Sequence, residues 1–531
     1  MPQITSNKII FGREDWLAGL HPQYTATGNY AQAGGNYAAT QRCFNPFRFL
    51  GYACPGYNPT AITKSSVLSA LVRNGFNNGA YAYLLEGGAK IHRLTIASNA
   101  LLDDAGGVGF PHTITHGAHT TIVGNDCVLY NHKVGGTSAL RYMYSFSDSA
   151  DWDIGTCDMN VTTPAFDDDF MSTAPATPLG ASYITDGKGY PHPLIVGDDD
   201  ILYIGDRNYV HAYDGQDADN DGKFIAEALV LPKGYIITSF AKIAPRTMCV
   251  FAYYSSSGSG DSFYHGTSKC FFWNYLDQDP FDIEDLEDNY VSEAFSYNGT
   301  VACFTQGRPS DLANSSKSSK LKIYNGDKFE EVANFIGNAP IRGGAEVIGK
   351  EIRWVESSGY HIFSYGNNFG ITPSLNIIGE SQNSANAGGM LRTFSSGSSV
   401  VSATTSDPAY YLNLVNSNYY GQSQISTTLV ELSENVDINE IRVRFLGTAT
   451  GGRAFSLSIT DEFASSTYNV ISNLETITAT NKTTTALLRS GGETIPSMRR
   501  FKLVLSWSIG SGATQSPIVS EIEISYKPSK Y

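Results

Sequence analysis

The stretch Ile201-Leu202-Tyr203-Ile204-Gly205-Asp206, followed by Tyr209-Val210-His211-Ala212-Tyr213-Asp214-Gly215, decides the fold. Both runs are rich in β-branched and aromatic residues, and a short polar turn separates them. This pattern is typical of a β-hairpin, because such side chains favour strands and polar residues favour the turn. The second run ends in an aromatic residue followed by Asp-Gly. The stretch therefore predicts two antiparallel strands with a recognisable end.

Similar strand ends recur between about residues 75 and 385. They lie at 91–94, 128–131, 271–274, 321–326 and 361–366. The aromatic markers Tyr213, Trp273, Tyr324 and Tyr365 are 60, 51 and 41 residues apart, close to the roughly 40 to 50 residues of a four-stranded propeller blade. We therefore predict an all-β protein with a β-propeller of about six blades over 75–385, with seven left open. An irregular β-sandwich is the competing interpretation.

Three flanking segments complete the predicted organisation. Residues 1–74 are rich in Gly, Asn, Tyr and Ala and are interrupted by prolines, which suits an extended N-terminal arm lying on another surface. Residues 381–406 carry few large apolar side chains and read as a linker. Residues 407–531 contain strictly alternating runs such as Ile441-Arg442-Val443-Arg444-Phe445. One face of each such strand is buried, which predicts a C-terminal β-sandwich or jelly roll.

Composition and charge exclude several partners. Charged residues make up only 16% of the chain, against an average of about 25%. Lys+Arg 36 and Asp+Glu 51 give a net charge of −15, so neither tight nucleic-acid binding nor binding to anionic lipid is expected. The first residues lack the pattern of a secretory signal, and no run reaches the roughly 18 apolar residues of a membrane helix. We expect no membrane span.

Seven cysteines are scattered along the chain without a Cys-x-x-Cys pair. They are Cys43, Cys54, Cys127, Cys157, Cys249, Cys270 and Cys303. An odd, scattered set without metal-ligand spacing favours reduced thiols that pack in the core of a protein made in the cytoplasm.

The sharpest local motif is Asp217-Ala218-Asp219-Asn220-Asp221-Gly222, which matches the first half of a calcium loop. Three alternate carboxylates can converge on one hard cation, and Gly222 permits the turn. The twelfth loop position is Ala228 rather than the expected Glu, although Glu227 and Asp214 lie close enough to substitute. A solvated acidic hairpin tip is the alternative, and calcium is the one cofactor that the sequence suggests.

Histidine and aspartate clusters offer weaker signals. His112, His116 and His119 have a spacing that could gather imidazoles on a metal, but no Cys or carboxylate follows at metal-ligand spacing before Asp126. Carboxylates that could supply a glycosidase pair occur at Asp151 and Asp153, at 167–169 and at 198–200. Runs of three aspartates more often mark solvated loops. Nucleophile elbows, phosphate-binding loops and zinc-protease motifs are missing from the sequence, so we predict no catalytic residues and no enzymatic activity.

Two tyrosine pairs have several interpretations. Tyr410-Tyr411 and Tyr419-Tyr420 could stack on sugars if exposed. Anchoring of subunit contacts or of the sandwich core fits them better, because tyrosine brings a large, rigid and half-polar surface to either setting.

Some phrases resemble bacteriophage virion proteins, in particular the β-propeller proteins that form the nozzle of short tails. They are Asn45-Pro46-Phe47-Arg48 with Gly51-Tyr52 and Pro55-Gly56, the hairpin Leu202-Tyr203-Ile204-Gly205 to Tyr213-Asp214-Gly215, and Leu231-Pro232-Lys233-Gly234-Tyr235-Ile236-Ile237. The resemblance implies a non-enzymatic structural subunit that is assembled in the host cytoplasm and forms a ring with other tail proteins around the DNA exit channel of the virion. A carbohydrate-binding or glycoside-cleaving propeller that recognises a receptor is the alternative function.

Overall fold

The structure is a computed structural model of the 531-residue chain. It describes residues 3–5, 8–12, 16, 38–42, 52–56, 60–61, 63–64, 72–78, 81–95, 100–102, 109–117, 121–134, 137–148, 150–159, 163–173, 178–185, 190–215, 222–243, 245–255, 267–288, 290–306, 318–336, 339–340, 342–355, 361–366, 373–380, 387–393, 398–403, 410–413, 421–427, 429–461, 466–478, 483–487, 495–512 and 514–529.

Almost all regular structure in these residues is β-strand, as the sequence predicted. The helices α2 (Phe170–Thr173) and α3 (Ala181–Ile184) are single turns of four residues each. Across the described ranges, no helix combines the length and the apolar character that crossing a membrane requires.

The hairpin that decides the fold forms as predicted. Strand β16 (Leu202–Asp206) pairs with β17 (Tyr209–Asp214), in a register that runs from Leu202 opposite Tyr213 to Asp206 opposite Tyr209. The two-residue turn places Arg207 at a φ of +51°, the conformation that tight hairpin turns require. All five residues of β16 are buried, which explains why its sequence is a nearly continuous apolar run.

Seven sheets follow one another, which we number as blades 1 to 7. Blade 1 contains β5 (Thr63–Lys64), β6 (Val72–Asn78), β7 (Tyr81–Glu86), β8 (Lys90–Thr95), β9 (Ala100–Leu102) and β10 (His112–Thr113). Blade 2 contains β11 (Val123–Val134), β12 (Thr137–Ser147), β13 (Trp152–Asp158) and β14 (Phe166–Asp167). Blade 3 contains β15 (Leu194–Val196), β16, β17 and β18 (Lys223–Val230). Blade 4 contains β19 (Tyr235–Ile243), β20 (Thr247–Tyr254), β21 (Ser268–Trp273) and β22 (Asp282–Asp285).

The remaining blades have four strands each. Blade 5 contains β23 (Tyr290–Tyr297), β24 (Thr300–Gln306), β25 (Ser318–Tyr324) and β26 (Phe329–Ile336). Blade 6 contains β27 (Ala345–Ile348), β28 (Glu351–Val355), β29 (His361–Gly366) and β30 (Ser374–Glu380). Blade 7 contains β31 (Ala387–Thr393), β32 (Ser398–Ala403), β33 (Tyr410–Asn413) and, from the N-terminal region, β4 (Thr60–Ala61).

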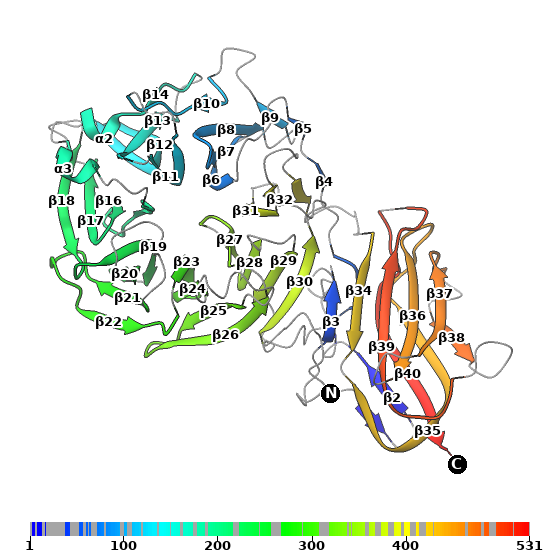
Figure 1. The fold of residues 1–531 in the computed structure, drawn as a ribbon. Helices are drawn as coiled ribbons and strands as arrows, with labels where there is room; N and C mark the ends of the chain where they lie inside the picture. Colours follow the sequence, from blue (N-terminus) through cyan, green and yellow to red (C-terminus); the bar gives the residue numbers. More distant parts are fainter. Residues whose placement is uncertain are drawn as a thin grey trace.

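The blades are arranged around an axis, so the predicted propeller is confirmed (Figure 1). In the described residues six of these sheets have four strands and blade 1 has six, so the ring includes the seventh blade that the sequence had left open. Strands β6, β11, β15, β19, β23, β27 and β31 are innermost in their blades, and the ring closes where β31 of blade 7 lies against β6 of blade 1.

The predicted linker at 381–406 is wrong in part. Strands β31 and β32 lie within it, and β33 pairs with β32 on one side and with β4 on the other. Tyr410 and Tyr411 therefore belong to β33 of the propeller rather than to the C-terminal region, and Tyr419-Tyr420 lie outside the described residues. The sequence hid this blade because Gly, Ser and Ala dominate it, whereas strand pairing needs only backbone hydrogen bonds.

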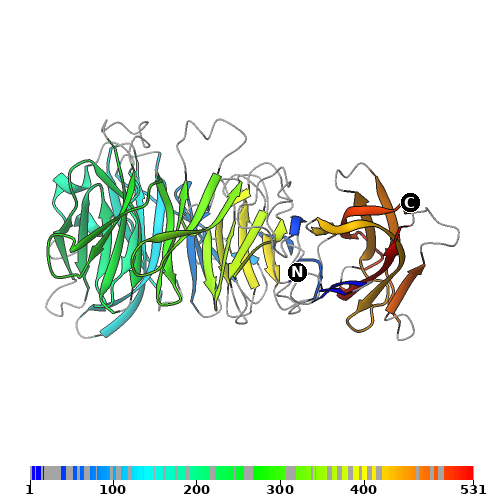
Figure 2. The ribbon, with the colours of Figure 1, turned by 90° about the horizontal axis from the view of Figure 1, so that it is seen from below.

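The C-terminal region forms a ten-stranded sheet that consists of two five-stranded layers. One layer has the order β37 (Thr467–Leu474), β36 (Ala454–Asp461), β39 (Met498–Ser508), β34 (Ser423–Thr427) and β3 (Ala38–Arg42). The other has the order β38 (Thr483–Leu487), β35 (Val430–Phe445), β40 (Val519–Pro528), β2 (Lys8–Phe11) and β1 (Gln3–Thr5). The layers join where β35 pairs with β39, and residues of both share one hydrophobic core. Seen from below, this region lies beside the propeller (Figure 2).

The described cysteines have the predicted character. Cys54, Cys127, Cys157, Cys249, Cys270 and Cys303 are all buried thiols. Cys43 lies outside the described residues.

One ion pair holds the centre of the propeller. The carboxylate of Asp126 in β11 accepts hydrogen bonds from Asn74 Nδ2 in blade 1 at 2.6 Å, from the Leu194 backbone N–H in blade 3 at 2.7 Å, and from Arg342 Nε. Arg342, which precedes blade 6, also donates to Ser239 Oγ in blade 4 and to the Leu194 carbonyl, both at 2.9 Å. We call Asp126 and Arg342 the central pair, because they connect blades 1 to 4 with the segment before blade 6.

We predict that Arg342→Met lowers the free energy of unfolding of the propeller by about 3 to 5 kcal/mol, because it leaves the buried Asp126 carboxylate without its counter-ion. Chemical denaturation followed by circular dichroism measures the loss. Arg444→Met is the control: its ion pair with Glu521 joins side chains that are 49% and 29% exposed, so it should cost less than about 1 kcal/mol. Equal small losses in both variants would contradict a dominant role for the central pair.

Candidate functional site

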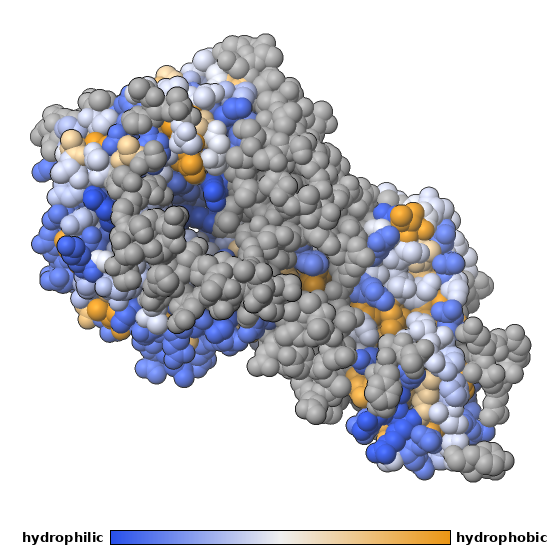
Figure 3. Space-filling view, in the orientation of Figure 1, coloured by the Kyte–Doolittle hydropathy of each residue, from blue (hydrophilic) through white to orange (hydrophobic). Residues whose placement is uncertain are grey.

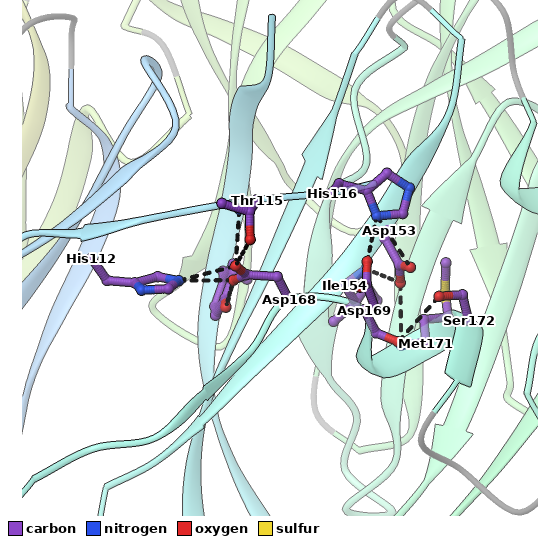
Figure 4. A network of polar contacts seen from close by, with 10 residues as sticks. His112, Thr115, His116, Asp153, Ile154, Asp168, Asp169, Met171 and Ser172 are labelled. Carbon is purple, nitrogen blue, oxygen red and sulfur yellow. Dashed lines mark hydrogen bonds and ion pairs between the residues drawn. The ribbon is translucent and has the colours of Figure 1, made fainter. Parts of the chain in front are cut away.

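Three of the polar clusters predicted from sequence meet beside blade 2. Strand β10 and the segment after it bring His112 and His116 over blade 2, the turn between β14 and α2 brings Asp168 and Asp169, and β13 supplies Asp153 (Figure 4). These residues form two neighbouring groups, one around Asp168 and one around Asp153.

Asp168 is the centre of the first group. It accepts hydrogen bonds from His112 Nε2 at 2.9 Å, from the Thr115 backbone N–H at 2.9 Å and from the Tyr144 hydroxyl. The ring of His112 also stacks on Phe166, with centroids 3.8 Å apart and planes inclined by 3°. Burial of Asp168 favours its protonated form, but these hydrogen bonds outweigh burial and hold the pKa of Asp168 below its usual value. The group therefore fixes an ionised carboxylate in place.

The second group is His116, Asp153 and Asp169. His116 Nδ1 lies 2.7 Å from Asp169 Oδ1 and 3.9 Å from Asp153 Oδ2. The Asp153 side chain has no solvent exposure. Its Oδ1 accepts the backbone N–H groups of Ile154 at 2.7 Å and Met171 at 3.1 Å. Its Oδ2 is buried without a hydrogen bond, so one carboxylate oxygen points toward His116 with unused capacity.

Burial is the main cause that raises the pKa of Asp153 to about 7, and hydrogen bonds from Ser172 and the Ile154 N–H oppose it. An ionised carboxylate at this depth requires a positive partner. Protonated His116 or a metal cation can supply that charge.

The second group has the donor set of a divalent metal site. One imidazole nitrogen and two carboxylate oxygens lie within 4.8 Å of one another. Borderline cations such as Zn²⁺ and Mn²⁺ accept this mixture of nitrogen and oxygen ligands. Within the predicted histidine motif of His112, His116 and His119, His116 therefore lies beside carboxylates that are distant in the sequence. His119 lies outside the described residues.

A hydrolytic carboxylate pair has less support from this geometry. The Asp168 oxygens are engaged by three side chains or backbone groups, and the cavity that runs along the propeller axis is lined by other residues. Asp151 sits in a bridge to Thr185. In the third predicted carboxylate cluster, Asp198 pairs with Lys242 at 3.0 Å and Asp199 accepts the Tyr203 hydroxyl at 2.6 Å. The aspartates of that cluster therefore have a structural role, because these contacts stabilise the turn in which they lie.

The predicted calcium ligands Asp217, Asp219 and Asp221 lie outside the described residues. Gly222 adopts a φ of +92°, and a Cβ there would lie 2.2 Å from the Tyr213 hydroxyl, so the turn requires glycine as the motif suggested. Glu227, offered as a substitute ligand, instead accepts a hydrogen bond from the Tyr183 hydroxyl at 2.8 Å. Calcium binding stays a prediction.

Sequence reasoning missed a second polar location, the axial cavity. It has a volume of about 410 Å³ and lies among the innermost strands of the blades, where Arg73, Asn125, Thr238, Ser292 and Arg342 line it. Figure 3 shows the propeller hollowed near its centre, with hydrophilic residues at the opening. The sequence signal is faint, because four of these residues lie in strands that are far apart in the sequence and Arg342 lies in the segment before blade 6.

Comparisons with known proteins give little guidance. No family model matches the chain, and no curated protein matches it. Among solved structures, the chain is similar to the crystal structure of the computationally designed Ika8 protein, with 11% sequence identity and a TM-score of 0.36. The similarity covers 66% of this chain and 99% of that chain.

We predict that Zn²⁺ or Mn²⁺ added to metal-free protein raises its melting temperature, since a ligand at about 100 times its dissociation constant stabilises the folded state by about 2.7 kcal/mol. Asp153→Ala should abolish the shift measured by differential scanning calorimetry. His112→Gln is the matched control, because His112 bonds Asp168 and is outside the donor set. A shift that survives Asp153→Ala would place the metal elsewhere.

A second prediction concerns pH in the presence of a chelator. Because the pKa of Asp153 is raised to about 7 in the folded protein, the native state keeps a proton that the unfolded chain releases near pH 4. Stability should therefore fall as pH rises from about 4 to about 7. Asp153→Asn cannot ionise and should flatten this fall in a series of thermal melts. An equally steep fall in the variant would assign the pH dependence to other groups.

Proposed function

We propose that this chain is a non-enzymatic structural subunit of a bacteriophage virion, a tail nozzle or tube component that assembles as a ring around the DNA exit channel. The sequence resemblance to short-tail propeller proteins supports this proposal, and so does the propeller fold. The observation that carries it is an exposed apolar surface on the outside of blades 3 and 4.

This surface, which we call the outer rim, consists of residues 276–287 with Ile225. Leu276 is 85% exposed, Phe281 58% and Ile283 45%, and Ile225 in the neighbouring β18 is 40% exposed. Large apolar side chains grouped on a surface mark a protein contact. The same segment carries six acidic residues, Asp277, Asp279, Asp282, Glu284, Asp285 and Glu287. The partner surface is therefore expected to be apolar with basic residues around it.

The connection between the propeller and the C-terminal layers also suits a structural subunit. Strands of the inferred extended N-terminal arm pair with both parts of the protein. Strands β1 and β2 extend one layer of the inferred C-terminal sandwich, and β3 extends the other. Strand β4 completes blade 7. The chain therefore passes between the two parts twice, once between β3 and β4 and once between β33 and β34. Such a subunit can transmit force between neighbours in a ring.

The DNA channel of the proposed ring lies between copies rather than along the propeller axis. Arg342 contacts blades 2, 3 and 4. The next residue, Gly343, donates its N–H to Glu293 in blade 5 at 2.6 Å, and a Cβ on it would lie 2.4 Å from the Arg73 carbonyl in blade 1. These two residues cross the centre of the propeller. The net charge of −15 suits a conduit that does not retain phosphates.

Carbohydrate recognition is the second candidate function. The axial cavity favours it, because polar side chains and the tyrosines Tyr253 and Tyr290 line a volume of about 410 Å³, within the usual range for small-molecule sites. A glycan array and a polysaccharide hydrolysis screen separate this function from the structural one. Turnover that a single Asp substitution abolishes would overturn the structural proposal.

Electron microscopy of the purified protein and of its parent particle tests the proposed function. We expect rings, and we expect the double variant Leu276→Glu with Phe281→Glu to remain folded but to lose them, since each apolar side chain buried in a contact contributes about 1.5 to 3 kcal/mol. Lys328→Glu is the control, an exposed charge change on neighbouring blade 5. A stable monomer that is absent from every particle would refute the structural role, and rings that survive the double variant would exclude the outer rim as the contact.

A further inference from the structure

Four of the innermost strands carry the same irregularity. Their pairing with the second strand of the blade shifts register by one residue, which is the signature of a β-bulge. The bulged residues are Arg73 in β6, Asn125 in β11, Thr238 in β19 and Ser292 in β23. A bulge redirects a side chain out of the normal alternation, and all four of these residues line the axial cavity.

The residue after each bulge has a different role. Asn74, Asp126, Ser239 and Glu293 are buried polar residues. Asp126 is itself a member of the central pair. Asn74 donates a hydrogen bond to Asp126, Ser239 accepts one from Arg342, and Glu293 accepts one from the Gly343 N–H. At each bulge, the bulged residue lines the cavity and the polar residue after it belongs to the buried hydrogen-bond network. Four blades repeat this division, so the cavity lining is a built feature of the propeller.

Arg73 is the unusual member of the lining. Burial lowers the pKa of its guanidinium, and among the residues that the structure describes no ion pair or hydrogen bond to its side chain is found. Arg342, by contrast, has its charge neutralised by Asp126. A cation removed from water without a counter-ion is costly. The cavity therefore contains one uncompensated positive charge.

The acidic groups around the cavity do not neutralise Arg73. Asp126 is saturated by Asn74, Leu194 and Arg342, and Glu293 is directed at the Gly343 backbone. The hydroxyl of Ser292 is buried without a hydrogen-bond partner, which leaves a second donor on the cavity wall.

We propose that the axial cavity binds a small organic molecule through a carboxylate or phosphate group that pairs with Arg73. The planar guanidinium matches such a group with two parallel N–H donors. Ser292 contributes a hydroxyl donor, and Asn125 and Thr238 contribute polar groups from the facing blades. The site is independent of the outer rim and of the metal donor set, so it goes beyond the proposed structural function.

Isothermal titration calorimetry on the full chain tests the proposal with three probes: glucuronate, inorganic phosphate and neutral glucose. We expect at least one of the two oxyanions to bind and glucose not to bind. Glucuronate binding without phosphate binding identifies a hydroxylated carboxylate as the ligand class, and phosphate binding identifies a phosphorylated one. If neither oxyanion binds, the proposal is wrong.

Variants connect the binding to the cavity. Arg73→Gln should weaken it roughly tenfold to hundredfold, the range for a charged hydrogen-bonded pair, and Ser292→Ala should weaken it by roughly two- to tenfold. Arg246→Gln is the matched control, because it removes one positive charge from an exposed turn of blade 4 outside the cavity. Circular dichroism verifies that each variant is folded. Equal affinities for Arg73→Gln and Arg246→Gln would assign the binding to the protein surface and overturn the proposal.

Discussion

The central pair, Asp126 with Arg342, is the constraint on which the propeller depends. The innermost strands of the blades converge at the axis, where the Asp126 side chain is only 1% exposed and depends on protein partners. Each charge of the pair is met by three hydrogen bonds from different blades. A buried pair of this kind contributes less to net stability than to the uniqueness of the arrangement, because any rotation of one blade about the axis would leave a charge unpaired. The position of the axial cavity follows from this network.

The N-terminal strands impose a second constraint, on the edges of the sheets. An open edge exposes unpaired backbone groups and invites aggregation. Strand β4 covers the edge of β33 in blade 7, and β2 covers the edge of β40 in the C-terminal layers. One chain segment therefore closes two separate folding units. Neither unit completes its sheets from its own consecutive residues, which gives the propeller and the C-terminal layers a common requirement for the N-terminal region.

The strands that can be predicted from the sequence are those whose burial leaves a clear pattern of apolar residues. The alternating residues of β39 were readable because one buried face imposes a period of two. The hairpin at 201–215 was readable because its buried strands are short, mostly apolar runs bounded by turn residues. Blade 7 was not readable, since its strand β4 lies more than 300 residues from β33. The donor set of His116, Asp153 and Asp169 joins three sequence clusters that only the folded structure brings together. The axial bulges escaped because a bulge breaks the alternation that a sequence pattern detects.

The two proposed contact surfaces of the propeller differ in strand position. The outer rim includes β22, the fourth strand of blade 4, whereas the bulges that line the axial cavity lie on innermost strands. Strands in a sheet are about 4.8 Å apart, so three spacings place the two surfaces roughly 14 Å from each other within a blade. At that distance the effects of substitutions add rather than couple. Acidic residues gather on the rim and the Arg73 guanidinium lines the axial cavity, so the same propeller can present an acidic, apolar exterior and an anion-binding centre.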